Sequence, residues 1–289
     1  MNAPVADPRL LRGAPVRQRI LDEARSYISA EPGIGKLVSV SIGDSPEVAV
    51  YVRNQAKVAH QLGLPFDQEF WGGEVTQDAC KSLIQKMNDD PSVLGVILQR
   101  PVPEHINVRS LQSAIHPLKD VEGMNPASIG NIIYNDVALA PCTAAAAVEL
   151  VRETGLPLEG LEVVMIGHSE IVGKPAAMML MAEGATVTVC HHMTRSVAMH
   201  SRRADVVVVA VGKAHLIGAD MIKPGAVVID IGINQTGNGI LGDVDTEAVK
   251  EIAGWITPVP GGVGPVTVAI LMRNATVAHR RQKAVGWID

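Results

Sequence analysis

The sequence predicts an α/β protein built from two parallel-sheet units. Across 289 residues, apolar strand-like runs alternate with helix-like segments in two separate stretches. In the second stretch the apolar run 163–166 ends at Gly167, and Gly173 opens a helical pattern. A strand, a glycine turn and a helix in this order are typical of a Rossmann-like, doubly wound nucleotide domain. We expect a substrate domain at 1–140, a nucleotide domain at 141–266, and a C-terminal helix at 267–289 that packs back on the first domain.

Composition limits the partners that we expect. Hydrophobic residues make up 47% of the chain and aromatic residues 3%, so the cores must consist mainly of aliphatic side chains. The net charge is −5 and no basic tract occurs, which argues against nucleic acid as a partner.

The three cysteines, Cys80, Cys142 and Cys190, are odd in number and far apart. This spacing suits neither a disulfide framework nor a metal site, so we expect a reducing compartment and no metal. The N-terminus lacks the charged and apolar segments of a signal peptide, and no apolar run approaches bilayer length. We therefore expect a soluble, cytoplasmic protein without a membrane partner.

The first domain follows the order β-α-β-α-β after an initial helix. Ser45 and Pro46 predict a helix start, and Gly63 predicts its end. The expected elements are a helix at 15–30, a strand at 36–42, a helix at 46–62, a strand at 65–71, a helix at 76–88 and a strand at 93–98.

The second domain repeats this alternation. The expected elements are a helix at 144–153, a strand from 162, a helix ending at 183, a strand at 186–190, a helix near 196, strands at 205–211 and 226–231, a hairpin-like segment at 234–239, and a helix from 267. A loop dense in glycine and proline, 258–265, precedes this last helix.

The turn after the first strand of the second domain is the expected phosphate site. Ser169 stands where the G-x-G-x-x-G pattern has its middle glycine. A serine is small enough for close approach of a pyrophosphate, and its hydroxyl adds a donor. An ordinary strand-turn-helix connection is the alternative.

The next strand ends in 190–195, which contains no carboxylate. NAD-binding domains commonly place an acidic residue near this point to hold the ribose hydroxyl. His168, His192 and Arg195 instead favour a 2′-phosphate, and hence NADP, with NAD remaining possible. Ile233, after a later strand, could meet the nicotinamide ring. The histidines could also be exposed loop residues without a ligand.

In the first domain, Gln99 follows a buried strand, Asp120 lies in a loop, and Tyr51 lies in a helix. Each residue alone could be structural. Together, beside a nucleotide domain, they predict a substrate pocket between the domains.

Four motifs in this order resemble the methylenetetrahydrofolate dehydrogenase/cyclohydrolase family. They are Leu98-Gln99-x-Pro101-x-Pro103, Lys119-Asp120-Val121-x-Gly123, Gly167-x-Ser169-x-x-Val172-Gly173-x-Pro175, and Pro258-Val259-Pro260-Gly261-Gly262-Val263-Gly264-Pro265-x-Thr267. The resemblance extends from about Arg12 to the last helix. It implies a two-domain homodimer that oxidises 5,10-methylenetetrahydrofolate to 5,10-methenyltetrahydrofolate with a nicotinamide cofactor.

The resemblance also implies roles for individual residues. Tyr51 resembles the tyrosine that stacks on the folate, Asp120 the aspartate that binds the pterin, and Gln99 the glutamine beside the catalytic lysine. Pro260 and Gly261 fall in the substrate loop. Cofactor contacts are implied for Gly167, His168, Ser169, His192 and Ile233.

Three positions depart from the family pattern. Gln55 stands where Tyr-x-x-x-Lys has its lysine, so we expect little or no cyclohydrolase activity. Residues 141–146 read PCTAAA instead of Pro-Cys-Thr-Pro-x-Gly, and His168 stands where NADP-using members commonly have arginine. Two alternatives remain: a nicotinamide-dependent dehydrogenase of another small molecule, or a catalytically silent relative that binds a ligand or partner.

Overall fold

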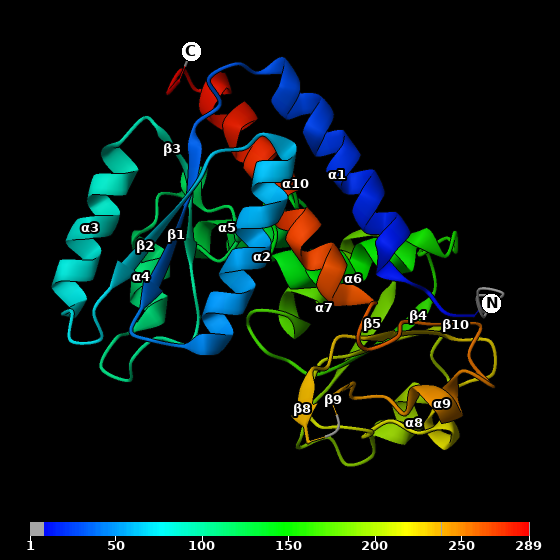
Figure 1. Cartoon of the computed structure of the whole chain (residues 1–289). Coiled ribbons are helices and arrows are strands. Elements are labelled where there is room, and N and C mark those ends of the chain that lie inside the picture. The colour runs from blue at the N-terminus through cyan, green and yellow to red at the C-terminus, as the bar shows by residue number, and fades with distance from the viewer. Residues whose placement is uncertain (1–8, 238, 289) are drawn as a thin grey trace, which may run out of the picture. The chain divides into compact units, whose positions relative to one another are not determined.

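The computed structural model describes residues 9–237 and 239–288 and divides the chain into two units (Figure 1). The three-stranded unit contains Arg19–Pro141 and the chain from Val268 onward. The five-stranded unit contains the chain up to Gln18 and Cys142–Thr267. The predicted α/β fold with two domains and parallel sheets is confirmed.

The three-stranded unit has a parallel sheet with the strand order β2-β1-β3. Its elements are β1 (Lys36–Ile42), α2 (Pro46–Leu62), β2 (Phe66–Trp71), α3 (Gln77–Asp89), β3 (Val93–Leu98), α4 (Val108–Ala114), η1 (Pro117–Lys119) and α5 (Pro126–Ile133). Two longer helices, α1 (Gly13–Ala30) and α10 (Val263–Ala284), each have residues in both units.

Helices cover both faces of this sheet, and α2 and α3 lie on opposite sides of it (Figure 1). Val38 and Val40 of β1 pack with Ile84 of α3 and Leu111 of α4 in one apolar core. Every residue of β3 is buried, as expected for a strand covered on both faces. Alternate residues of β1 point the other way, and Ser39 is the buried polar residue among them.

Local signals explain where α2 and α3 begin and end. Ser45 Oγ accepts the Val48 N–H at 3.5 Å, and Pro46 occupies the first helical position. Gly63 ends α2 with a φ of 76°, a conformation that glycine adopts without steric cost. Thr76 Oγ1 likewise accepts the Ala79 N–H at the start of α3.

The five-stranded unit has an all-parallel sheet in the order β10-β7-β6-β4-β5. Its elements are α6 (Cys142–Glu153), β4 (Glu162–Ile166), α7 (Gly173–Ala182), β5 (Thr186–Cys190), α8 (Val197–Ser201), β6 (Val206–Val209), η2 (Ala219–Met221), β7 (Val227–Asp230), α9 (Thr246–Val249) and β10 (Trp255–Ile256), with the antiparallel hairpin β8 (Asn234–Thr236) and β9 (Gly239–Leu241).

The strand order of this unit fixes where a ligand can bind. The chain leaves β4 for β5 on one side, and later places β6 on the other side of β4. In open parallel sheets, ligands bind at the carboxyl ends of the strands where the order reverses in this way. The turns that follow β4, β5, β6 and β7 therefore form the candidate nucleotide site.

The helix α10 begins at Val263, earlier than the expected residue 267. Pro265 lies in its first turn, where a backbone N–H has no helical partner, so proline is tolerated there. The segment before α1 was predicted to be part of the first domain, 1–140, but the structure groups it with the other unit. It belongs to the five-stranded unit, because Leu11 N donates to Ile256 O and Gly13 N to Gly261 O.

Within residues 9–237 and 239–288, no helix combines the length and apolar character that crossing a membrane requires.

Candidate functional site

A buried amide pair lies at the end of β3 in the three-stranded unit. Gln99 follows β3, and its Nε2 donates to Gln55 Oε1 at 2.8 Å and to Ser39 Oγ at 3.0 Å. Gln55 is 1% exposed, although it lies on a helix at the protein surface. The structure thus joins two of the predicted catalytic residues through one hydrogen bond.

Tyr51 lies one helical turn before Gln55 on α2 and is 41% exposed. Side chains four residues apart share a helix face, so the ring lies on the side that carries the amide pair. A partly exposed aromatic ring next to buried polar groups can stack on a planar ligand. Its predicted role as a substrate contact remains a prediction.

Asp120 is 2% exposed, and groups from its own loop surround its carboxylate. It accepts the N–H of Met124 at 3.0 Å, the N–H of Asn125 at 2.7 Å and the hydroxyl of Ser128 at 2.7 Å. Burial raises the pKa of Asp120, and these hydrogen bonds act in the opposite direction. The contacts hold the start of α5, which is a structural role that the sequence prediction of a substrate contact did not include.

Glu122, two residues later, is the carboxylate that sequence reasoning missed. Its Oε2 accepts the Leu98 N–H at 2.8 Å, which places it beside the strand end that carries Gln99. Desolvation raises its pKa to about 7, with a smaller upward contribution from Asp120 and a downward one from Arg100. Perturbed carboxyl groups of this kind concentrate at functional sites. Its position in the segment 119–123 was the available signal.

In the five-stranded unit, Gly167 and Gly173 shape the predicted phosphate turn. Gly167 has a φ of 114°, and a Cβ there would lie 2.1 Å from Ala210 O. A Cβ on Gly173 would lie 2.1 Å from Gly167 O. No larger residue fits either position, so the tight approach of β4, its turn and α7 requires both glycines.

Ser169 has a different immediate role from the one expected. Its Oγ accepts the N–H groups of Val172 at 3.2 Å and Gly173 at 3.4 Å, so it binds the start of α7. Two of the helix N-terminal donors are therefore already occupied by this oxygen, while its hydroxyl hydrogen can still be donated. Contact with a cofactor stays a prediction for Gly167 and Ser169.

Three histidines, His168, His191 and His192, form a group that we call the histidine cluster. The rings of His168 and His191 stack at 4.6 Å, and that of His192 lies 6.1 Å from His168 and 5.8 Å from His191. Burial, His191, Lys174 and His192, in that order, lower the pKa of His168. The sequence prediction named His168 and His192, and the structure adds His191 to them.

The cluster also bears on the prediction of no metal site, which considered only cysteine spacing. One ring nitrogen from each histidine lies within 4.8 Å of the others. Imidazole nitrogen is a common ligand of zinc and related ions.

A buried carboxylate pair organises the turns after β6 and β7. Asp243 accepts three backbone N–H groups, from Val211 at 2.7 Å, Gly212 at 3.0 Å and Lys213 at 2.8 Å. It also accepts the Asn234 side-chain N–H at 2.9 Å, next to the predicted cofactor contact Ile233, which is 63% exposed. The sequence reasoning missed Asp243, whose turn-rich setting gave no distinct signal.

Asp230, at the end of β7, is bound to the same turns. Its oxygens accept the N–H groups of Gly232, Asp243 and Val244 at 2.9 to 3.1 Å. Burial raises its pKa to about 6, and the charge of Asp243 acts in the same direction. The two carboxylates therefore fix the backbone of the turns that follow β6 and β7.

Pro260 and Gly261 lie in the loop before α10, within the five-stranded unit. Pro260 is exposed, and Gly261 has a φ of 109° with its carbonyl bound to Gly13 N–H. Tyr51, Gln55 and Gln99 belong to the other unit. A shared substrate site for all of them stays a prediction.

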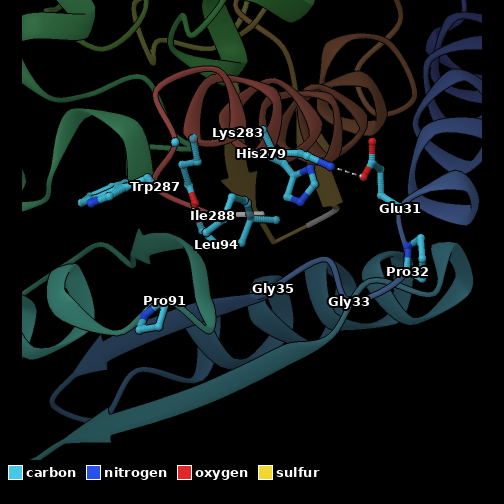
Figure 2. A pocket seen from close by; sticks show the side chains of 12 residues that line it. Glu31, Pro32, Gly33, Gly35, Pro91, Leu94, His279, Lys283, Trp287 and Ile288 are labelled. Carbon is cyan, nitrogen blue, oxygen red and sulfur yellow. Dashed lines mark hydrogen bonds and ion pairs between the residues drawn. The ribbon is translucent and has the colours of Figure 1, made fainter.

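A separate polar pocket of about 420 Å³ lies at the amino ends of β1 and β3, the sheet edge opposite Gln99. Figure 2 shows His279 and Lys283 of α10 facing this pocket, with Lys283 directed at Glu31. Lys283 pairs with Glu31 at 3.1 Å, and His279 bonds to the Tyr27 hydroxyl at 2.9 Å. These pairs hold α1 and α10 together at that edge.

The fold and these sites define a two-unit α/β protein with a Rossmann-type nucleotide unit and a second unit that carries buried polar groups. The chain belongs to the tetrahydrofolate dehydrogenase/cyclohydrolase family. Residues 11–122 match the family's catalytic domain, and residues 141–283 match its NAD(P)-binding domain.

Individual relatives agree along almost the whole chain. The bifunctional protein FolD 3 of Roseobacter denitrificans is 82% identical over 286 residues, which are 97% of this chain and 99% of that protein. The crystal structure of the bifunctional enzyme FolD from Campylobacter jejuni superposes with a TM-score of 0.91 at 36% identity, covering 94% of this chain and 99% of that one.

A third relative was solved with ligands. The Trypanosoma brucei methylenetetrahydrofolate dehydrogenase-cyclohydrolase, complexed with NADP cofactor and an inhibitor, has a TM-score of 0.88 at 32% identity. The match covers 95% of this chain and 98% of that one.

Proposed function

We propose that this chain oxidises 5,10-methylenetetrahydrofolate to 5,10-methenyltetrahydrofolate with NADP, and hydrolyses the methenyl product slowly or not at all. Family membership and relatives named as bifunctional FolD proteins support the dehydrogenase activity. Those relatives are named as bifunctional, so the proposal of slow or absent hydrolysis differs from their names. Its support comes from this chain's own residues.

The observation that carries the proposal is the buried amide of Gln55, at a position where the resemblance to the family implies a lysine. Hydride leaves the methylene bridge for the nicotinamide, and the product is a cation. This step needs alignment of the two reactants but no proton carrier. An amide pair can therefore line a site that transfers hydride.

Hydrolysis of the methenyl product needs more chemistry. Water adds to the bridge carbon and loses a proton, and a ring nitrogen gains a proton as the bridge opens. A positioned group that exchanges protons near neutral pH contributes about 10²- to 10⁴-fold to such steps. The amide of Gln55 can neither take a proton from water nor give one to the ring nitrogen. It also already accepts a hydrogen bond from Gln99. Lys57 is a poor replacement, because two residues along a helix point about 200° away.

For the substrate we propose a pterin contact at Glu122, with Tyr51 as the stacking surface. The carboxylate of Asp120 is already bound by Met124, Asn125 and Ser128. Glu122 accepts the Leu98 N–H at the end of the strand that carries Gln99, so its carboxylate lies beside that strand end. Its pKa of about 7 gives this contact a titration near neutral pH.

For the cofactor we propose NADP, with its 2′-phosphate at the histidine cluster and Arg195. The segment 190–195 offers imidazole and guanidinium donors and no carboxylate that would repel the phosphate. The relative from Trypanosoma brucei, solved with NADP, supports this choice. NAD remains the competing cofactor in any assay.

We also propose a homodimer. Support comes from the resemblance to the family and from β5, which is the last strand of its sheet. Thr186 and Val189 of β5 are exposed, and an open strand edge is a ready surface for pairing with a second copy.

Purified protein mixed with methylenetetrahydrofolate and either NADP or NAD tests the proposal. We expect reduced nicotinamide and methenyltetrahydrofolate to accumulate in equal amounts, faster with NADP. Turnover in which the methenyl product never accumulates contradicts the restricted hydrolysis. Cofactor binding without turnover indicates a different substrate. If neither ligand binds, the protein is a catalytically silent relative.

A further inference from the structure

The histidine cluster is a product of strand register, not of loop conformation alone. Strands β4 and β5 pair in parallel with Ile166 opposite Cys190, and Gly167 N donates to Cys190 O at 2.9 Å. The next residues of both strands, among them His168, His191 and His192, therefore leave the same edge side by side. The sheet therefore fixes the two strand ends from which these three residues leave.

The ring nitrogens are close to the spacing that a metal ion needs. One nitrogen from each ring lies within 4.8 Å of the others. Tetrahedral zinc with bonds of about 2.0–2.1 Å requires ligand nitrogens about 3.4 Å apart. His168 and His192 are exposed, so small rotations of their side chains can bring the nitrogens to that spacing.

One hydrogen bond must be released for all three rings to bind. His191 Nδ1 accepts the Met193 N–H at 3.2 Å, so its free nitrogen carries the proton in the neutral ring. To bind the ion, the free nitrogen of His191 must lose its proton, and the neutral ring then carries the proton on Nδ1. Nδ1 no longer accepts the Met193 N–H, which must turn to solvent. Met193 is exposed, so water can replace this bond.

We propose that the histidine cluster binds one divalent transition-metal ion of the zinc class. Three imidazoles and no carboxylate are ligands that suit Zn²⁺, Co²⁺ and Ni²⁺, whereas Mg²⁺ and Ca²⁺ need oxygen ligands. Three protein ligands leave a fourth tetrahedral position for water. Lys174 adds positive charge nearby, which keeps the affinity below that of a dedicated structural site.

The ion competes with NADP, a consequence that rests on the proposed cofactor site. An ion needs the lone pairs of the ring nitrogens, whereas a phosphate accepts their N–H groups. The same atoms cannot meet both demands at once, so binding of either ligand weakens the other. NAD lacks the 2′-phosphate and leaves the ion undisturbed.

Calorimetric titration of Zn²⁺ into the tag-free protein, without cofactor, tests the metal site. We expect one equivalent of Zn²⁺ to bind and Mg²⁺ not to bind. His168→Ala and His192→Ala each weaken Zn²⁺ binding at least about tenfold. The matched control is His60→Ala, which changes an exposed histidine on α2 and should keep the Zn²⁺ affinity of the unaltered protein. Co²⁺ gives the intense visible bands of four-coordinate cobalt in the unaltered protein and in the His60→Ala control, but not in the two cluster variants.

Unchanged Zn²⁺ affinity in both cluster variants, or no binding by the unaltered protein, overturns the metal site. Repeating the titration with saturating NADP or NAD tests the competition. We expect NADP alone to lower the Zn²⁺ affinity. Equal Zn²⁺ affinity with and without bound NADP overturns the competition. Because the first titration contains no cofactor and no folate, failure of the proposed function does not change its outcome.

Discussion

At the scale of single residues, Gln55 and Glu122 determine which proton transfers the three-stranded unit can support. Gln55 is buried and permanently neutral, and it is bonded to Gln99. Glu122 has a pKa of about 7 because of desolvation, so it exchanges protons in the physiological range. Of these two side chains, only the acid beside β3 can therefore exchange a proton.

Glu122→Gln tests the proposed pterin contact through its pH dependence. The raised pKa means that the carboxylate is ionised above about pH 7 and protonated below it. Folate affinity should therefore fall as the pH decreases through 7. The variant should bind folate about tenfold to a hundredfold more weakly above pH 7 and lose this inflection. Fluorescence titration across pH measures it, and an unchanged profile places the contact elsewhere.

Asp120→Ala should act on stability. The change leaves Met124 N–H, Asn125 N–H and the Ser128 hydroxyl without their acceptor, which costs about 2–4 kcal/mol of the free energy of unfolding. Urea denaturation measures this loss, and Glu122→Gln is the control with a small effect. A variant of normal stability whose folate binding is abolished would support the original prediction that Asp120 holds the pterin.

Sequence reasoning chose Asp120 over Glu122 from its place in the motif alone. Both lie in the segment 119–123, and only the folded loop shows that Asp120 points at three donors from its own turn. Gln55 and Gln99 were identifiable because each occupies a position in a recognisable motif. Their mutual hydrogen bond depends on contact between α2 and β3, which no spacing in the sequence reports.

At the scale of elements, the ends of parallel strands bring the functional groups of the five-stranded unit together. The register of β4 and β5 forms the histidine cluster. The turns after β6 and β7 are held by Asp243 and Asp230, whose carboxylates accept backbone N–H groups. Charge is therefore used at this edge to order the backbone before a ligand binds.

Asp230→Asn should change how stability depends on pH. The folded pKa is raised from 3.8 to about 6, so between these values the folded state holds a proton that the unfolded state has lost. The stabilising contribution of this proton is then fully present below pH 4. The free energy of unfolding decreases by at most about 3 kcal/mol as the pH rises to 6. Urea denaturation across this range should show a flatter profile for the variant. An equally steep decrease in the variant assigns the titration to another group.

The types of the elements could be predicted from apolar periodicity, but some of their boundaries could not. The strands β1, β3 and β5 and the helix α2 lie at the expected residues, because alternation and caps are local signals. The start of α10 at Val263 was not expected, because a glycine- and proline-rich segment usually signals a loop. The short helices α5 and α9 lack enough turns to show periodicity.

At the scale of the whole chain, the two units share α1 and α10 but carry different chemistry. The five-stranded unit holds the glycine turn and the histidine cluster, and the three-stranded unit holds the amide pair and Glu122. The inclusion of the segment before α1 in the five-stranded unit follows from its backbone bonds to Ile256 and Gly261. Such long-range pairing leaves no mark in the order of helices and strands, so the sequence could not indicate it.

Val189→Lys tests the proposed homodimer. Val189 is 40% exposed on β5, and a lysine there charges an edge that a second copy would have to cover. We expect a dimer for the unaltered protein in analytical ultracentrifugation and a monomer for the variant. Lys57→Ala, on the exposed side of α2, is a control that should stay dimeric. A dimer of unchanged affinity in Val189→Lys places the interface away from β5.

The central claim is that Gln55 permits hydride transfer and prevents hydrolysis, and the decay of methenyltetrahydrofolate tests it most directly. Decay is followed by absorbance, after subtraction of the spontaneous rate, with the unaltered protein, Gln55→Lys and Gln55→Met. We predict little or no decay above the spontaneous rate for the unaltered protein and for Gln55→Met. Gln55→Lys, which introduces an amine, should accelerate decay, within the range of about 10²- to 10⁴-fold for a positioned proton carrier. Substantial hydrolysis by the unaltered protein would contradict the account.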